Sequence, residues 1–385
     1  MKKKIIILGS TGSIGKNTIE IIRKDKKNFK IELLSTNRNI LSVVNQAKEF
    51  NVKNVIINDY NSFLNAKSMF SDLGINFYNS FSIIEKLFKK KTIDYSMVSL
   101  VGIDGLYPTI TIVKISKYVA IANKESIICG WFFIRKALQR FKTSFIPVDS
   151  EHFSIWSTIG NFDSINKVFL TASGGPFLNL STNQLKKKTV NDALSHPTWK
   201  MGKKISIDSA TLMNKVFEII EAKKIFNLSY DQLDVIIHPS SYIHSIVKFK
   251  NGLIKICAHD PIMAIPIASS LEKTSYNIFE KNRIKFDILN SPNFLKVNKK
   301  KYPIIKLLDK LPKKDSLFET VLVTVNDYFV NLFLNKKIKY SDLVQLILKI
   351  ISKPFFNKYK NITPKSINDI LNLRSYVLKN IDKYI

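Results

Sequence analysis

Residues 5–15 read Ile5-Ile6-Ile7-Leu8-Gly9-Ser10-Thr11-Gly12-Ser13-Ile14-Gly15, and this stretch decides the fold of the first part of the chain. Four consecutive apolar residues are typical of a strand buried on both faces of a parallel sheet. A glycine-rich turn and a helical pattern follow, as in dinucleotide-binding folds, where the first helical amides face a pyrophosphate. The spacing is Gly-x-x-Gly-x-x-Gly and not the commoner Gly-x-Gly-x-x-Gly, so a tight turn without a ligand stays an alternative.

A second strand is predicted at Ile31–Leu34, followed by Ser35-Thr36-Asn37-Arg38-Asn39. An NAD site usually has an acid here for the ribose 2′-hydroxyl. This chain has none and offers Arg38, whose guanidinium can pair with a 2′-phosphate. The pattern favours NADPH over NADH, with an ordinary surface arginine as the alternative.

The α/β alternation continues, because strands are predicted at Val55–Ile57, Tyr95–Val101 and Tyr118–Ala122 with helical periodicity between them. The motif Ala122-Asn123-Lys124-Glu125 falls where a strand ends and a helix begins, the edge at which open α/β sheets bind ligands. A plain lysine at a helix start is the alternative for Lys124.

Two acids follow the next predicted strand, Phe145–Val148, in the motif Val148-Asp149-Ser150-Glu151-His152. Residues i and i+2 of an extended segment point the same way, so Asp149 and Glu151 are expected to converge on one point. Two close carboxylates repel each other unless a cation or proton lies between them, and such hard oxygen ligands suit Mg²⁺ or Mn²⁺. Two solvated acids at a strand end are the alternative.

The strand Val168–Ala172 leads into Ser173-Gly174-Gly175-Pro176, whose small residues leave backbone amides and a hydroxyl free to hold an anion. The segment Ser195–Gly202 contains His196, Trp199 and Met201, and it either lines a pocket or is a packed loop.

A single helix is predicted over Asp208–Glu221, with Asp208 or Ser209 as its N-cap. Its apolar stripe is Met213, Val216, Phe217 and Ile220. The polar residues Asn214, Lys215 and Glu218 share another face and could hold a phosphate beside a metal; a surface helix with a Lys–Glu pair is the alternative.

The totals exclude several protein classes. With 385 residues the chain is too long for a single core, and two distant cysteines give no disulfide framework. The net charge of +30 comes from scattered lysines without a nucleic-acid-binding motif, so a basic field that attracts phosphorylated ligands is expected and nucleic-acid binding is not. The first apolar run is too short for a secretory signal and none could cross a bilayer, so we expect a cytoplasmic protein that does not bind membranes.

The expected architecture is α/β in three parts: a Rossmann-like NADPH-binding domain (1–150), a central α/β catalytic domain (151–272) and a C-terminal helical domain (301–385), with a connector at 273–300. Helical patterns in the last part cover Ser316–Leu334, Ser341–Lys353 and Ser366–Ile381.

Six motifs, in this order along the chain, resemble the 1-deoxy-D-xylulose 5-phosphate reductoisomerase family: Gly9–Gly15, Ala122–Glu125, Val148–His152, Thr171–Phe177, His196–Gly202 and Asp208–Glu221. The resemblance implies that Asp149, Glu151 and Glu218 bind one divalent cation, with Co²⁺ as a third candidate. It implies that the substrate is bound by Lys124, Ser150, Glu151, Ser173, His196, Ser209, Asn214, Lys215 and Glu218, with catalytic roles for Lys124, Glu151 and His196. NADPH would contact Thr11, Gly12, Ser13, Ile14, Asn37, Arg38, Asn39, Asn123, Glu125 and Gly202.

The implied reaction converts 1-deoxy-D-xylulose 5-phosphate to 2-C-methyl-D-erythritol 4-phosphate by a metal-assisted rearrangement and an NADPH-dependent reduction. It belongs to the non-mevalonate route to isoprenoids, and the expected setting is a bacterial cell. The resemblance also implies a homodimer and a mobile loop that carries Trp199 and closes over the substrate, with Met201 near the nicotinamide. It implies structural or interface roles for His238 and His244. This chain departs from the family pattern at Asn37, Asp104 and Ala264. A generic two-domain NADP-linked dehydrogenase is the alternative function, since it would share the first domain without needing the three acids.

Overall fold

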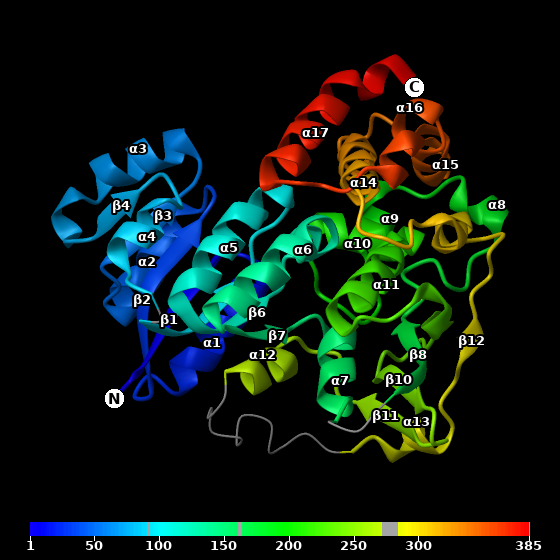
Figure 1. Cartoon of the computed structure of the whole chain (residues 1–385), viewed down its shortest axis with the longest axis horizontal. Coiled ribbons are helices and arrows are strands. Elements are labelled where there is room, and N and C mark those ends of the chain that lie inside the picture. The colour runs from blue at the N-terminus through cyan, green and yellow to red at the C-terminus, as the bar shows by residue number, and fades with distance from the viewer. Residues whose placement is uncertain (91, 161–163, 272–283, 385) are drawn as a thin grey trace. The chain divides into compact units, whose positions relative to one another are not determined.

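The computed structural model describes residues 1–90, 92–160, 164–271 and 284–384, and Figure 1 shows its elements. Residues 273–283 of the predicted connector lie outside the described residues. The chain forms two compact units. Unit 1 contains Met1–Ser126, Phe132–Phe153 and the segment that begins at Met263; unit 2 contains Ile127–Trp131, Ser154–Ile262 and the C-terminal part of the chain.

Unit 1 is built on a seven-stranded parallel sheet with the order β4-β3-β2-β1-β5-β6-β7. Its strands are β1 (Lys3–Leu8), β2 (Phe29–Thr36), β3 (Asn54–Ile57), β4 (Asn76–Tyr78), β5 (Ile93–Val98), β6 (Ser116–Ile121) and β7 (Ser144–Pro147). Its helices are α1 (Ser13–Lys24), α2 (Ile40–Phe50), α3 (Tyr60–Met69), α4 (Ile83–Leu87), α5 (Leu106–Ile115) and α12 (Ala264–Ser270). The helices α6 (Lys124–Phe141) and α7 (Ser150–Thr158) contribute residues to both units.

The strand order reverses between β1 and β5, and in open α/β sheets ligands bind at the carboxyl ends of the strands at this switch point. The Rossmann-like sheet is therefore confirmed. The predicted strand Tyr95–Val101 ends three residues earlier, at Val98.

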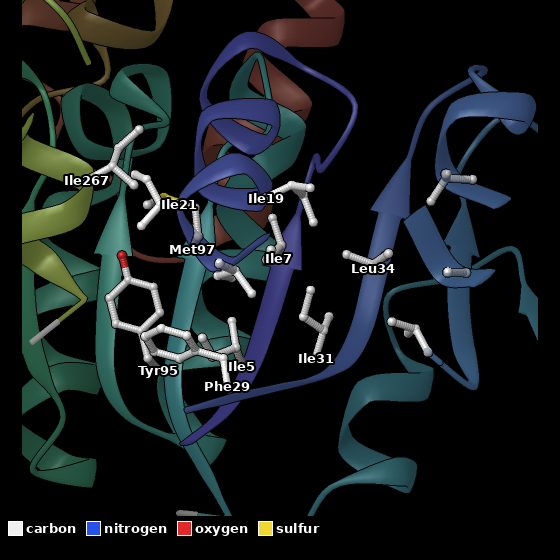
Figure 2. Close-up of a cluster of buried hydrophobic side chains, with 14 of the residues drawn as sticks. Ile5, Ile7, Ile19, Ile21, Phe29, Ile31, Leu34, Tyr95, Met97 and Ile267 are labelled. Carbon is white, nitrogen blue, oxygen red and sulfur yellow. The ribbon is translucent and has the colours of Figure 1, made fainter. Parts of the chain in front are cut away.

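The core of unit 1 includes a helix from far along the chain (Figure 2). Ile267, Ala268 and Leu271, in and just after α12, pack in one buried cluster with Ile5, Ile7 and other residues of the sheet and of α1. The Tyr95 hydroxyl lies 2.6 Å from Ser270 Oγ, and Lys3 Nζ donates to the Leu271 carbonyl at 3.1 Å. The predicted domain limits stay a proposal, and they did not anticipate that α12 packs with the N-terminal sheet.

Unit 2 contains a five-stranded mixed sheet with the order β11-β10-β8-β9-β12, in which β8 and β9 are parallel and the other pairs are antiparallel. Its strands are β8 (Ile165–Ala172), β9 (Leu233–Ile237), β10 (Ile243–Phe249), β11 (Ile254–Ala258) and β12 (Leu295–Lys296). The segment between β8 and β9 holds α8 (Thr182–Leu185), α9 (Val190–Leu194), α10 (Lys203–Thr211) and α11 (Met213–Phe226).

The part after residue 301 is helical, as predicted, with α14 (Phe318–Leu334), α15 (Tyr340–Ile351), α16 (Pro354–Asn357) and α17 (Ile367–Asn380). The short helix α13 (Phe286–Asn290) lies in the predicted connector, where no helix was expected. Short 3₁₀ helices occupy Ser71–Leu73, Ile103–Gly105, Tyr230–Gln232, Pro303–Lys310, Lys358–Asn361 and Ile381–Tyr384. No helix in the described ranges is both long enough and apolar enough to cross a membrane.

The prediction of one helix over Asp208–Glu221 was wrong. The chain forms α10 and α11, which meet at Leu212 in the left-handed conformation with φ 64°. Asp208 and Ser209 therefore lie near the end of α10 and do not cap the second helix. The apolar stripe was correct, because Met213, Val216, Phe217 and Ile220 are all fully buried.

Candidate active site

The glycine turn after β1 brings the backbone into close contact, as a dinucleotide site requires. Gly9 has φ +81°, and a Cβ there would lie 2.5 Å from the Ser99 carbonyl oxygen. A Cβ on Gly15 would lie 2.3 Å from the Gly9 carbonyl oxygen, so only glycine lets the start of α1 pack this closely. The predicted cofactor residues Thr11, Gly12, Ser13 and Ile14 lie in this turn and in the first residues of α1, at the carboxyl end of β1. The turn therefore fits a pyrophosphate group.

Arg38 has a partner that the sequence analysis did not consider. Its side chain is 75% exposed, and Nε lies 3.0 Å from Asp59 Oδ1. Asp59 caps α3 by accepting from the Ser62 amide at 3.1 Å, and the hydrogen bonds from Ser62 and then Arg38 lower the pKa of this carboxyl group. A bound 2′-phosphate would share the guanidinium with Asp59, so both alternatives for Arg38 stay open.

The strand-to-helix motif after β6 forms a rigid corner. The Asn123 side chain accepts from the Ser126 amide at 2.6 Å and donates to the carbonyls of Leu100 and Gly102 at 2.8 and 3.0 Å. Asn123 is thus the N-cap of α6, and Lys124 is the first residue of this helix. Lys124 is buried, and its Nζ lies 3.3 Å from Asp149 Oδ2, so a plain exposed helix-start lysine is excluded.

The acidic motif after β7 differs from the extended geometry predicted for it. The Asp149 carbonyl accepts from the Phe153 amide at 2.8 Å, and Asp149 Oδ1 accepts from the Glu151 amide at 3.3 Å. Asp149 therefore caps α7, and Glu151 lies in its first turn. Ser150 Oγ donates to Glu151 Oε2 at 2.5 Å. The acids are neighbours at a helix start, not alternate residues of a strand.

In unit 2, His196 joins two of the predicted substrate-binding serines, Ser173 and Ser209. Its Nε2 lies 3.1 Å from Ser173 Oγ and 3.1 Å from Ser209 Oγ. Its Nδ1 accepts from the amides of Thr198 and Trp199 at 3.2 and 3.0 Å, so Nδ1 carries no proton and the neutral ring is protonated at Nε2. Burial lowers the pKa of His196 to about 4, which keeps the ring neutral at physiological pH.

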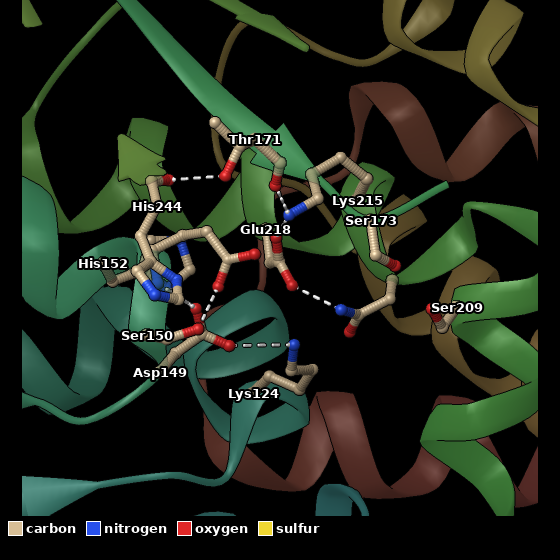
Figure 3. A network of polar contacts seen from close by, with 12 residues as sticks. Lys124, Asp149, Ser150, His152, Thr171, Ser173, Ser209, Lys215, Glu218 and His244 are labelled. Atoms are coloured by element: carbon tan, nitrogen blue, oxygen red, sulfur yellow. Dashed lines mark hydrogen bonds and ion pairs between the residues drawn. The ribbon is translucent and has the colours of Figure 1, made fainter. Parts of the chain in front are cut away.

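The polar face of α11 is buried. Lys215 and Glu218 are 3% and 1% exposed, which excludes the surface-helix alternative. Glu218 accepts from Asn214 Nδ2 and pairs with Lys215 Nζ, and Lys215 also donates to the Thr171 carbonyl (Figure 3). The carboxylate thus has an amide and a cation on its own helix.

The remaining predicted residues have simple placements. Gly202 is the N-cap of α10, and a Cβ there would meet no atom within 4 Å. Asn39 caps α2 by accepting from the Ser42 amide at 3.2 Å. The ring of Trp199 packs edge-on against His244, 6.0 Å between centroids. His238 and His244 are both buried, which fits the structural role expected for them.

Three further contacts were not predicted from the sequence. His152 Nδ1 lies 3.4 Å from Asp149 Oδ1. Residues three apart are neighbours on a helix, so a helix predicted from residue 150 would have indicated this contact. Asn326 Nδ2 donates to Asp208 Oδ1 at 2.8 Å and so ties α10 to α14, a contact over 118 residues of sequence. Thr171 Oγ1 donates to the Ile243 carbonyl at 2.7 Å, and no local pattern marks it.

Comparison with known proteins identifies the family. The profile described as 1-deoxy-D-xylulose 5-phosphate reductoisomerase matches residues 5–130, and the profiles of the family's C-terminal domains match 145–226 and 259–379. The reductoisomerase of Pelagibacter ubique (strain HTCC1062) is 52% identical over 378 residues, which cover 97% of each chain. The chain belongs to the 1-deoxy-D-xylulose 5-phosphate reductoisomerase family.

Other members of the family are similar to this chain over nearly the full length of both proteins. The reductoisomerase of Wolbachia pipientis wMel is 37% identical, covering 96% of this chain and 95% of its own. The Zymomonas mobilis reductoisomerase, solved in complex with NADPH, has a TM-score of 0.85 at 28% identity, covering 98% and 97% of the two chains. A reductoisomerase solved with NADPH, fosmidomycin and magnesium has a TM-score of 0.87 at 26% identity and full coverage of both.

Proposed function

We propose that the chain converts 1-deoxy-D-xylulose 5-phosphate to 2-C-methyl-D-erythritol 4-phosphate, using NADPH and a divalent cation, in the non-mevalonate isoprenoid pathway. It is an NADP-dependent oxidoreductase of the reductoisomerase family. The observation that carries the site assignment is the buried group on α11, because a carboxylate with a lysine and an amide beside it suits a metal next to a phosphate. A generic NADP-linked dehydrogenase would not need this group.

For the metal we propose Asp149, Glu151 and Glu218. Asp149 and Glu151 lie together at the start of α7, and Glu218 lies on the buried polar face of α11. An all-carboxylate set of hard oxygen ligands suits Mg²⁺ or Mn²⁺ better than softer metals. Magnesium is present in related solved structures.

For the substrate we propose that Ser173, Ser209, Asn214 and Lys215 hold the phosphate, while Ser150 and Lys124 contact the remainder of the sugar. We call the segments Ser173–Gly175 and Ser209–Ala210 the phosphate cradle. The His196 Nε2–H can donate a hydrogen bond to either serine hydroxyl, each 3.1 Å away. The other hydroxyl can then donate to a phosphate oxygen.

When bound, the cation would supply Lewis-acid stabilisation of charge on the substrate oxygens, and NADPH would supply the hydride. We assign Lys124 and Glu151 to proton handling at these oxygens. Phosphate binding supplies energy remote from the reacting carbons, which can order the His196–Gly202 segment over the substrate and exclude water. For NADPH we propose the Thr11–Ile14 turn, Asn37, Arg38, Asn39, Asn123, Glu125 and Gly202.

The deciding experiment follows NADPH oxidation with 1-deoxy-D-xylulose 5-phosphate in the presence of Mg²⁺ or Mn²⁺ and after EDTA. Turnover is expected with metal and lost without it. Glu218→Gln should lower kcat by about a thousandfold or more, because metal catalysis supplies several kcal/mol of transition-state stabilisation. NADPH affinity should be nearly unchanged.

Glu221→Gln is the matched control, since Glu221 lies on the same helix and is equally buried, 1% exposed. It should retain metal-dependent turnover. NADPH oxidation that survives EDTA would favour the generic dehydrogenase. Equal loss of NADPH binding and turnover in Glu218→Gln would remove Glu218 from the metal site.

We also propose a homodimer in the cytoplasm. The support for assembly is β11, an edge strand whose Ile254 and Ile256 are 55% and 53% exposed. An exposed apolar edge strand is a ready surface for pairing with a second copy. The location and the absence of nucleic-acid and membrane partners stay predictions.

A further inference from the structure

Two tyrosines from the C-terminal part of the chain donate hydrogen bonds to the backbone of the phosphate cradle. The Tyr302 hydroxyl donates to the Gly174 carbonyl at 2.9 Å, and the Tyr340 hydroxyl donates to the Ala210 carbonyl at 2.8 Å. Each bond joins residues about 130 positions apart in sequence. One tyrosine therefore contacts each of the two segments that carry the anion-binding serines.

The Tyr302 bond fixes the carbonyl side of a peptide between two glycines. Gly174 and Gly175 both have positive φ, +85° and +69°, and glycine tolerates many other conformations. In a trans peptide the carbonyl and the following N–H point to opposite sides. With the Gly174 carbonyl held by Tyr302, the Gly175 N–H points the other way and donates to Ser173 Oγ at 3.1 Å. The tyrosine thereby sets the direction of the serine hydroxyl.

The Tyr340 bond acts on the other segment. Ala210 lies in the last turn of α10, where carbonyls lack the regular helical partner. The two segments touch, because a Cβ on Gly175 would lie 2.8 Å from the Ser209 carbonyl oxygen. A shift of either segment would therefore change the spacing between the serines.

Both rings are firmly held and their hydroxyls stay protonated. Tyr302 and Tyr340 are 2% and 7% exposed. The Tyr340 ring packs edge-on against Phe177 and Phe333, with centroids 4.8 and 5.9 Å away. Burial raises the pKa of Tyr302 to about 12 and also raises the pKa of Tyr340, so each hydroxyl is a donor across the pH range of an assay.

We infer that Tyr302 and Tyr340 are positioning residues for substrate phosphate: their hydroxyl groups orient the two segments whose serines bind it. This inference rests on the proposed function. Neither tyrosine needs to touch the substrate, and their effect should be confined to binding of the phosphate group.

The test replaces each tyrosine by phenylalanine, which removes one hydroxyl and keeps the ring. Tyr302→Phe and Tyr340→Phe should raise KM for 1-deoxy-D-xylulose 5-phosphate roughly five- to tenfold, the size of one lost orienting hydrogen bond. The inhibition constant of inorganic phosphate, used as a competing probe, should rise by the same factor. KM for NADPH should stay within about twofold.

Tyr95→Phe is the matched control, because it removes a buried tyrosine hydroxyl bond to Ser270 in unit 1. It should lower Tm to a similar degree and leave both phosphate readouts unchanged. If Tyr95→Phe shifts KM as much as the other two at equal loss of Tm, or if neither Tyr302→Phe nor Tyr340→Phe shifts the phosphate inhibition constant, the inference is overturned. Wild-type protein without turnover of the sugar phosphate would instead refute the proposed function.

Discussion

His196 is neutral because of where its two nitrogens point. Two backbone amides donate to Nδ1, and two serine hydroxyls lie at Nε2. A second proton would have to enter at Nδ1 and displace both amides, in addition to the cost of burying the charge. The two carboxylate oxygens of Asp149 also have different partners. Oδ1 accepts from the backbone at the start of α7, and Oδ2 faces the Lys124 ammonium group.

The His196 geometry predicts an acid-dependent loss of stability. The folded pKa of about 4 lies below the ordinary 6.5, so between these values the unfolded chain binds the proton more readily. This contribution to the free energy of unfolding is therefore complete above pH 6.5 and falls as the pH drops toward 4. His196→Gln cannot take up the proton, so its urea midpoint should fall less than that of wild type between pH 7 and 4.5. Parallel pH profiles for the two proteins would contradict this account.

Local patterns in the sequence predicted helices and strands correctly. The order β1, glycine turn and α1 follows from residues 5–24, and the stripe Met213–Ile220 follows from helical spacing. Predictions were wrong where a local pattern was absent or where two patterns competed. Leu212 adopts φ 64°, although leucine gives no sign of a helix break. Asp149 was taken as the end of a strand, although aspartate is also a preferred N-cap residue. The packing of α12 and the tyrosine contacts join residues over 120 apart, which no periodicity reports.

The close contact of Gly15 with the first turn gives an element-scale prediction. Gly15→Ala would place a Cβ 2.3 Å from the Gly9 carbonyl oxygen, so α1 must move away from β1. We expect NADPH affinity to fall at least tenfold in a fluorescence titration, with a lower Tm. Gly74→Ala is the control: its φ is +62° but no atom lies within 4 Å, so it should cost about 1–2 kcal/mol of backbone strain and leave NADPH binding intact. Unchanged cofactor affinity in Gly15→Ala would mean that the turn does not bind the pyrophosphate.

The net charge of +30 over the full chain needs no nucleic-acid partner to explain it. The sugar phosphate and NADPH are both anions, and a basic protein attracts both through its long-range field. Contacts between segments far apart in the sequence also complete the fold of each unit. The segment from Met263 returns to unit 1, and the helices after Tyr302 reach back to the cradle in unit 2. Each unit is completed by residues far downstream of its first strand.

The apolar edge of β11 predicts how two copies associate. Ile256→Lys places a charge in the middle of the exposed strand, where burying it against a partner is unfavourable. Sedimentation velocity at micromolar concentration should find a dimer for wild type and a shift toward monomer for this variant. Met69→Lys, at a residue of α3 in unit 1 that is 64% exposed, makes the same kind of change outside β11 and should remain dimeric. If Ile256→Lys stays fully dimeric, β11 is not in the interface, because a lysine in a paired edge strand would remove most of the apolar contact between the two copies.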